Sequence, residues 1–281
     1  MLGMFYLANK AEDKAIIEYQ KFVQANRSLC SARNSAESNA LIRLGPKREF
    51  LDLIIQSLAF DRDGSCIEML SAIAYAVNDD QKFSQDVIAR LTPIVQSTSD
   101  LSLRSLFLSF LAGQKQYRQI IAIAPKFLPS SDVELNDDLF RQAGRMVYMI
   151  ADAHEEVGDL DQAIRLYEMS SAYQKQLDDN NDTNRSNSLV LSWDLGRVNW
   201  KQGKVPQAIA LLQSVTKHEQ SQRTRRLDDG SNVSFRALAH NLLGEIFQSQ
   251  GKKAEAKQQF EAAIKATDTF QTPKDNLAQL R

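Results

Sequence analysis

Residues 240–266 read HNLLGEIFQSQGKKAEAKQQFEAAIKA, and the helical pattern of the chain is clearest in this stretch. Apolar residues recur at every third or fourth position on both sides of Gly251, which predicts two amphipathic helices. Glycine adopts the left-handed conformation of a helix C-terminus at little cost because it has no Cβ. We therefore predict an antiparallel helical hairpin whose tip lies at Gly251.

Similar glycines stand upstream, each near the end of one helical pattern and before another. With Gly251 they form a series that is spaced by 45 to 49 residues, at Gly64, Gly113, Gly158, Gly203 and Gly251. Such regular spacing is typical of a repeat. We expect helix pairs with tips near these glycines and no sheet.

The residues around these glycines follow one template, in which small residues lie where two helices cross and large ones fill the gaps. The best copy has Leu243, Gly244, Phe247, Gly251, Ala256, Phe260 and Ala263. Two further copies have Leu195, Gly196, Gly203, Ala208 and Leu212, and Ile150, Ala151, Gly158, Ala163 and Tyr167. The first residues fit as well, with Leu2, Gly3, Tyr6, Ala15, Tyr19 and Phe22. The stretches around Gly64 and Gly113 match less well, with Met69 and Arg118 where a small residue is expected.

This pattern resembles the tetratricopeptide repeat, and the long period is similar to that of kinesin light chains and of bacterial tetratricopeptide regulators. The resemblance implies an all-α fold, a right-handed α-solenoid of antiparallel helix pairs with about five to six repeats. We expect a single solenoid over 1–281, with degenerate repeats in 1–135, clearer repeats in 136–270 and a C-terminal cap in 271–281. The chain could also be a piece of a larger protein.

Composition excludes several classes of function. The formal net charge of -1 gives no field that would attract nucleic acid. The start of the chain lacks a secretory leader, and no segment has the roughly 20 apolar residues needed to span a bilayer. We therefore expect a cytoplasmic protein without membrane insertion. The two cysteines, Cys30 and Cys66, are expected to be reduced thiols.

Motifs for catalysis or metal binding are missing. The three histidines, His154, His218 and His240, show no ligand spacing, and no phosphate loop or nucleophile motif occurs. We predict structural roles for all three histidines. The sequence therefore favours a protein that is not an enzyme and has no cofactor or metal site; its oligomeric state stays open.

The most informative helix for function is SLVLSWDLGRVNWKQG, residues 188–203. Helical spacing brings four side chains toward one face, namely Trp193, Arg197, Trp200 and Lys201. The resemblance implies that such positions line a concave groove, where tryptophan offers apolar area and arginine a fork for carboxylates. Alternatively, Leu189, Trp193, Gly196 and Trp200 form a second buried face against the neighbouring repeat.

Corresponding positions on the neighbouring first helices complete the predicted partner-binding groove. They are Tyr148, Asp152 and Glu155 in one repeat and Asn241, Glu245 and Gln248 in the next. The groove is thus expected to be mixed in charge, with an acidic edge near 152–156. The arginines at 223, 225 and 226 are interpreted as part of a solvated loop with local ion pairs to Asp228 and Asp229.

Two hypotheses for function follow. The first is a non-catalytic scaffold or adaptor that binds a peptide or protein on the concave surface. The second is a sensory or regulatory module, in which a bound peptide or small ligand controls an effector located elsewhere.

Overall fold

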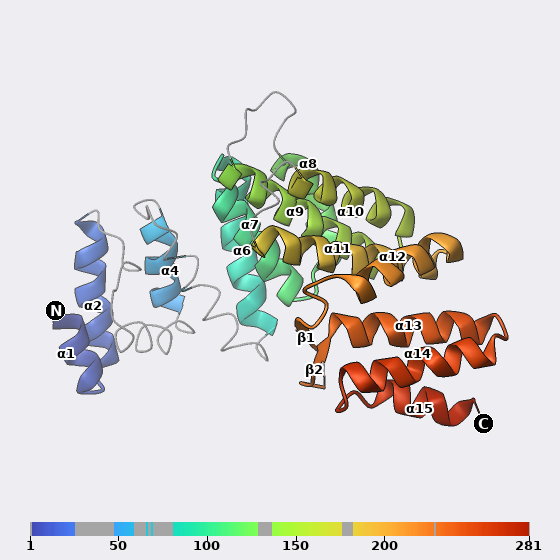
Figure 1. Cartoon of the computed structure of the whole chain (residues 1–281). Coiled ribbons are helices and arrows are strands. Elements are labelled where there is room, and N and C mark those ends of the chain that lie inside the picture. The colour runs from blue at the N-terminus through green and yellow to red at the C-terminus, as the bar shows by residue number, and fades with distance from the viewer. Residues whose placement is uncertain are drawn as a thin grey trace. The chain divides into compact units, whose positions relative to one another are not determined.

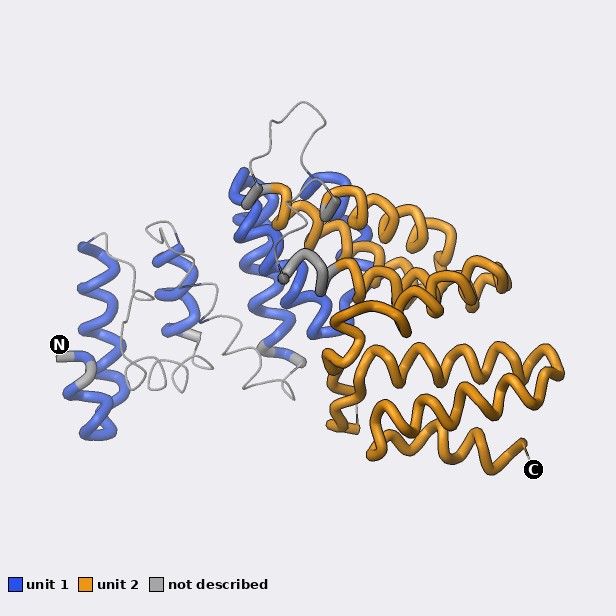
Figure 2. The backbone as a smooth tube through the Cα atoms, in the orientation of Figure 1, with its two compact units in different colours: residues 1–128 blue, residues 129–281 orange. Residues whose placement is uncertain are grey.

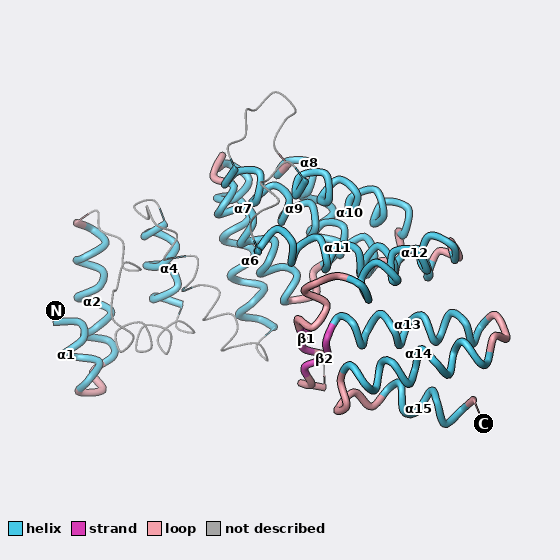
Figure 3. Tube along the Cα trace, viewed as in Figure 1, coloured by secondary structure: helices cyan, strands magenta, loops and turns pink. Residues whose placement is uncertain are grey.

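The computed structural model describes residues 2–25, 48–58, 66, 69, 81–128, 137–175, 182–227 and 229–280. The chain forms two compact units, residues 1–128 and 129–281 (Figure 2). Helices make up nearly all of the described structure (Figure 3). The prediction of an all-α fold built from helix pairs is confirmed.

In the first unit, each described helix packs against the next one along the chain. The helices are α1 (Leu2–Ala8), α2 (Glu12–Gln24), α4 (Arg48–Ser57), α6 (Gln81–Ser97), α7 (Leu101–Gly113) and α8 (Tyr117–Phe127). Pro93 lies inside α6. Asp100 caps the start of α7, because its side chain accepts hydrogen bonds from the backbone of Ser102 and Leu103.

The second unit stacks three antiparallel helix pairs, so it is a short α-solenoid (Figure 1). The pairs are α9 (Asp137–Glu156) with α10 (Leu160–Lys175), α11 (Asp182–Lys201) with α12 (Val205–Lys217), and α13 (Phe235–Ser249) with α14 (Lys253–Ala266). A final helix, α15 (Thr272–Gln279), packs against α13 and α14. The number of repeats in the whole chain stays a prediction, since the stretch around Gly64 lies outside the described residues.

Five helix pairs turn through the same backbone hydrogen bonds. At Gly203 the N–H donates to the Trp200 carbonyl, and the next N–H, of Lys204, donates to the Asn199 carbonyl. This is the Schellman arrangement, which requires a left-handed residue at the tip. The left-handed residues of the five tips are Lys10, Lys115, Gly158, Gly203 and Gly251.

The tip that the sequence places at Gly113 is two residues further on. Gly113 is the last residue of α7, and the left-handed residue is Lys115, with φ of 55°. The register of α8 therefore moves by two residues, so that Ile120 rather than Arg118 takes the position of the small crossing residue. A lysine gives no indication in the sequence that it will adopt the left-handed conformation, which explains why the tip was predicted at Gly113.

The small residues lie where the sequence places them, at the crossing of two paired helices. A Cβ added to Gly244 would stand 2.4 Å from the ring of Phe260, and one added to Gly196 would stand 2.9 Å from Leu212. Ala208 and Ala256 are fully buried. These close approaches fix the register of each pair.

The pairs α1–α2 and α7–α8 differ in how they fill this crossing. In the N-terminal pair Gly3 meets the ring of Tyr19, as predicted. In the pair α7–α8 the tip at Lys115 assigns the buried residues Leu108 and Ala124 to the equivalent positions. The large and small residues have exchanged places there, which keeps the summed volume of the crossing similar.

Two expectations from the sequence are wrong. A short antiparallel hairpin, β1 (Thr224–Arg226) with β2 (Asn232–Ser234), joins α12 to α13, although no sheet was expected. Ser234 ends this hairpin and caps α13 by accepting a hydrogen bond from the backbone of Ala237. Cys66 is buried and disulfide-bonded rather than a reduced thiol.

Helices of membrane-spanning length and apolarity are absent from the described residues.

Candidate functional site

The candidate site is built around α11, the middle first helix of the second unit, which has partners on several sides. Leu191, Leu195 and Val198 join an apolar cluster with Tyr167 of α10. Leu189 belongs to a second apolar cluster that includes residues of α12 and α13. A helix that packs on two sides has only a narrow strip left for polar side chains.

The two tryptophans lie on the side of α11 that packs toward α13. Trp193 is only 7% exposed and belongs to the second cluster, and Trp200 is half-buried and packs against the same cluster. The alternative of a second buried face therefore describes Trp193 correctly. Its indole N–H is buried and has no hydrogen-bond partner in the described part of the chain.

Arg197 and Lys201 lie on the remaining strip of α11, and both reach Glu155 of α9. One guanidinium nitrogen of Arg197 donates to Glu155 Oε1 and the other to Glu155 Oε2 at 2.8 Å, while Lys201 Nζ lies 2.7 Å from Glu155 Oε1. Arg197 also donates to Asp194 Oδ1 at 3.0 Å. The predicted face is thus two neighbouring strips, one with the tryptophans and one with the charges.

Four more groups complete what we call the central polar cluster, and one of them, Asp152, has its Oδ1 3.4 Å from the Tyr167 hydroxyl. The hydroxyl of Tyr148 donates to Asp194 Oδ2 at 2.8 Å, and that of Tyr167 donates to Glu155 Oε2 at 3.2 Å. Arg225, on the β-hairpin, lies 3.5 Å from Asp194 Oδ1. The cluster comprises Tyr148, Asp152, Glu155, Tyr167, Asp194, Arg197, Lys201 and Arg225.

Charge in this cluster is layered by depth. The side chains of Glu155 and Asp194 are 1% and 0% exposed, whereas those of Lys201 and Arg225 are 47% and 41% exposed. Arg197 lies between, at 22%. Part of the predicted acidic edge is therefore buried, and the cationic ends of Lys201 and Arg225 reach the solvent.

The surroundings shift the pKa values of several members. Burial raises the pKa of Asp152, and the carboxylates of Asp194 and Glu155 raise it further. Burial, followed by Asp194, also raises the pKa of Tyr148 far above its usual range. Burial alone would lower the pKa of Arg197, but Asp194 and Glu155 outweigh it and raise that pKa. Arg197 is thus a permanent cation that neutralises two buried carboxylates.

The predicted residues of α13 form a separate group. Asn241 is buried and donates to Glu245 Oε1 at 2.7 Å. Asn276 of α15 donates to both of them at 3.2 Å. Gln248 is half-buried near the end of α13. The structure therefore joins Tyr148, Asp152, Glu155, Arg197 and Lys201, and it places Asn241 and Glu245 in contact with the C-terminal helix instead.

Sequence reasoning missed Asp194, Tyr167 and Arg225. Asp194 could have been found, because it lies three residues before Arg197 on the same helical strip. Arg225 offered no local signal, since its partner is 31 residues away. The local ion pairs expected of its loop stay a prediction, because Asp228 lies outside the described residues.

Histidine, cysteine and carboxylate groups that could hold a metal ion do not occur in the described ranges.

Two stretches of the chain match models of a known repeat family. Residues 193–269 and residues 147–179 each match a model described as tetratricopeptide repeat. These stretches contain the whole central polar cluster and the pair α13–α14.

Two solved structures are similar to this chain at low sequence identity. The crystal structure of BtubC (BKLC) from P. vanneervenii has a TM-score of 0.52 and 11% identity, over 82% of this chain and 86% of that one. A tetratricopeptide repeat protein from Parabacteroides merdae ATCC 43184 has a TM-score of 0.47 and 13% identity, over 99% and 95%. No curated protein sequence matches this chain.

Proposed function

Because the chain is a tetratricopeptide repeat protein, we propose that it is a non-catalytic scaffold or adaptor that binds a protein or peptide partner. Such repeats generally mediate protein–protein interactions. Stacked helix pairs present an extended surface, which needs only a folded array to bind. The surface that we propose is the inner side formed by α9, α11 and α13.

The layered charge of the central polar cluster is the observation that carries this proposal. Lys201 and Arg225 are fixed by buried carboxylates, so their cationic ends are held in place before a partner arrives. Holding side chains in the bound geometry reduces the entropy lost on binding. Half-buried Trp200, on the adjoining strip of α11, adds apolar area. We therefore propose that the partner presents a segment that contains carboxylates.

Trp193 has a different role in this proposal from the one that its spacing predicts. Its side chain is buried among apolar residues, so it supports the surface from below. Lys201, Arg225, Trp200 and Asp152 are the proposed contacts.

The test compares partner binding by charge-neutral variants. Lys201→Gln with Arg225→Gln removes the two accessible cations and leaves Arg197 to neutralise Glu155 and Asp194. Both side chains are more than two-fifths exposed, so stability should change by at most about 1 kcal/mol. The matched control is Lys253→Gln, at an exposed position of α14.

Affinity capture from an extract of the source organism, with quantitative mass spectrometry, provides the measurement. Proteins that bind specifically should be recovered at least tenfold less with the double variant and equally with the control. Higher salt should weaken the same interactions, since exposed charges are screened. Equal recovery by the wild type, the double variant and the control would contradict the proposed surface.

A further inference from the structure

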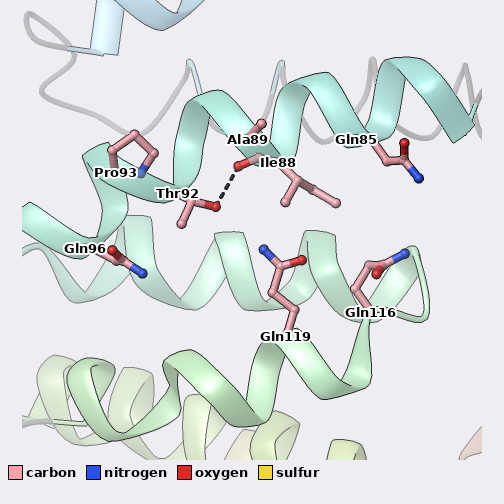
Figure 4. Close-up of a pocket in the computed structure, with 8 residues that line it drawn as sticks. All are labelled: Gln85, Ile88, Ala89, Thr92, Pro93, Gln96, Gln116 and Gln119. Carbon is pink, nitrogen blue, oxygen red and sulfur yellow. Dashed lines mark hydrogen bonds between the residues drawn. The ribbon is translucent and has the colours of Figure 1, made fainter.

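A cavity of about 400 Å³ lies in the first unit, between α6 and the beginning of α8 (Figure 4). Its lining residues are Gln85, Ile88, Ala89, Thr92, Pro93, Gln96, Gln116 and Gln119. A second cavity of about 310 Å³ shares Gln85, Ile88 and Gln116 with it and extends to the α7–α8 tip. The two cavities therefore form a continuous depression along α6.

The walls of the larger cavity combine glutamine side chains with the apolar residues Ile88, Ala89 and Pro93, and no charged side chain lines it among the described residues. The carboxamides of Gln85, Gln96 and Gln119 have no hydrogen-bond partner among the residues that the structure describes. Gln116 makes only a 3.4 Å contact with the Gln114 carbonyl. In Figure 4, Gln116 and Gln119 extend from α8 toward α6. Several unpaired amides thus face one space.

Two further polar groups at this depression also lack their usual partners. Ser84 lines the second cavity and is 3% exposed, yet its hydroxyl has no hydrogen-bond partner in the described part of the chain. A buried polar group without a partner is uncommon and requires an explanation. Pro93 has no N–H, so the Ala89 carbonyl loses its α-helical donor. The nearby Thr92 hydroxyl donates to the Ile88 carbonyl at 2.6 Å and not to the Ala89 carbonyl (Figure 4).

We propose that this depression binds an uncharged stretch of polypeptide, whose peptide and carboxamide groups pair with the wall glutamines. A carboxamide carries both donors and an acceptor, so it can pair with the donor and the acceptor of another amide at once. A buried charge on the ligand would need a counter-charge, which the described lining of the larger cavity does not offer, since the only cation at the depression among the described residues, Lys115, lines the second cavity alone. Ile88, Ala89 and Pro93 supply apolar contact beneath the amides.

This site is independent of the surface proposed above. It lies in the first unit and recognises neutral amides, whereas the central polar cluster lies in the second unit and recognises charge. It is also formed at α6 and α8 rather than on α9, α11 or α13.

The experiment uses the isotope-labelled full chain and a capped peptide of alternating glutamine and asparagine, six residues long. Nuclear magnetic resonance titration should shift the side-chain amide signals of the wall glutamines and the methyl signals of Ile88. Capped peptides in which glutamate or lysine replaces every glutamine should bind at least fivefold more weakly. Equal binding of all three peptides, or no binding at millimolar concentration, would overturn the proposal.

Variants distinguish this site from non-specific peptide binding. Ala89→Trp fills the cavity at an exposed helical position and should abolish the shifts at the wall glutamines. Gln85→Ala with Gln119→Ala should weaken binding at least tenfold, whereas Gln20→Ala, at an exposed position of α2, should leave it unchanged. Unaltered binding by the filled variant would also overturn the proposal.

The Lys201→Gln, Arg225→Gln variant separates the two proposals. It should bind the neutral peptide as the wild type does, because its changes lie in the other unit. A loss of neutral-peptide binding by this variant would contradict the independence of the two sites.

Discussion

Replacing Gly244 by alanine tests the helix crossing of the last repeat. The new Cβ would lie 2.4 Å from one ring atom of Phe260 and within 2.9 Å of two more. Phe260 is fully buried, so its ring can move away only if its neighbours move too. Overpacking of this kind costs about 1–3 kcal/mol, and such short contacts belong in the upper half of that range.

Alanine also favours the helix more than glycine does, by about 1 kcal/mol. The net loss for Gly244→Ala should therefore be about 1–2 kcal/mol. Urea unfolding followed by tryptophan fluorescence is a suitable assay, because Trp193 and Trp200 are the two tryptophans of the chain and both pack against the cluster that contains α13 residues. Adding Phe260→Leu should recover part of the loss, since Leu212 already fills the equivalent position below Gly196.

Gly113→Ala is the matched control. Its unfolding is measured by circular dichroism, because Gly113 lies in the first unit and both tryptophans lie in the second. No atom lies within 4 Å of its added Cβ, and its φ is not left-handed. It should therefore be neutral or stabilising by up to about 1 kcal/mol. A Gly244→Ala protein as stable as the wild type would refute the close crossing.

Three further predictions concern the second unit. Ala256→Leu should lower the free energy of unfolding by about 1–3 kcal/mol in urea titrations, because Ala256 is fully buried at the crossing. An unchanged urea midpoint would show that Ala256 does not lie at the crossing. Arg197→Glu should destabilise by about 3–5 kcal/mol, since it replaces the cation that Glu155 and Asp194 share with a third carboxylate; a stable variant would show that the cluster is not held by this arginine. Asp152→Asn should stabilise the protein near pH 7. The pKa of Asp152 is higher in the folded protein than its ordinary value of about 3.8, so the wild type loses stability as the pH rises from about 3.8 through the folded pKa. Asparagine carries no charge and avoids this loss. The gain, measured by urea unfolding across pH, should shrink on acidification, and a gain that grows would contradict the assigned shift.

The turns and crossings could be predicted because they depend on local chemistry. A left-handed helix end selects glycine, and a crossing selects a small residue sixteen positions before a large one, as with Gly244 and Phe260. The same rule fails at Lys115, where a lysine takes the left-handed conformation. It fails again at Leu108 and Ala124, where the sizes are exchanged.

The candidate site was harder to predict than the fold. Helical spacing brought Trp193 and Arg197 together, but only the packing of α11 on both sides separates a buried strip from a polar one. The pairing of Arg197 with Glu155 spans 42 residues and connects two repeats, so no local pattern reveals it. Arg197 is thus a mostly buried cation that joins two repeats rather than a free contact on the groove surface.

The depression in the first unit had no counterpart in the sequence analysis. Its glutamines come from the length of α6 and the beginning of α8, and they follow no motif. Their proximity depends on the packing of α6 with α8, which the weak repeat signal around Gly113 did not define.

Photo-crosslinking from both sides of the second unit is the most direct test of the proposed binding surface. A photoreactive phenylalanine analogue at exposed position 156 or half-buried position 248 samples the surface formed by α9, α11 and α13, and the same analogue at position 213 or 258 samples the second helices of the pairs. A captured partner should crosslink from positions 156 and 248 and not from positions 213 and 258. Crosslinking from the second helices alone would contradict the proposed surface.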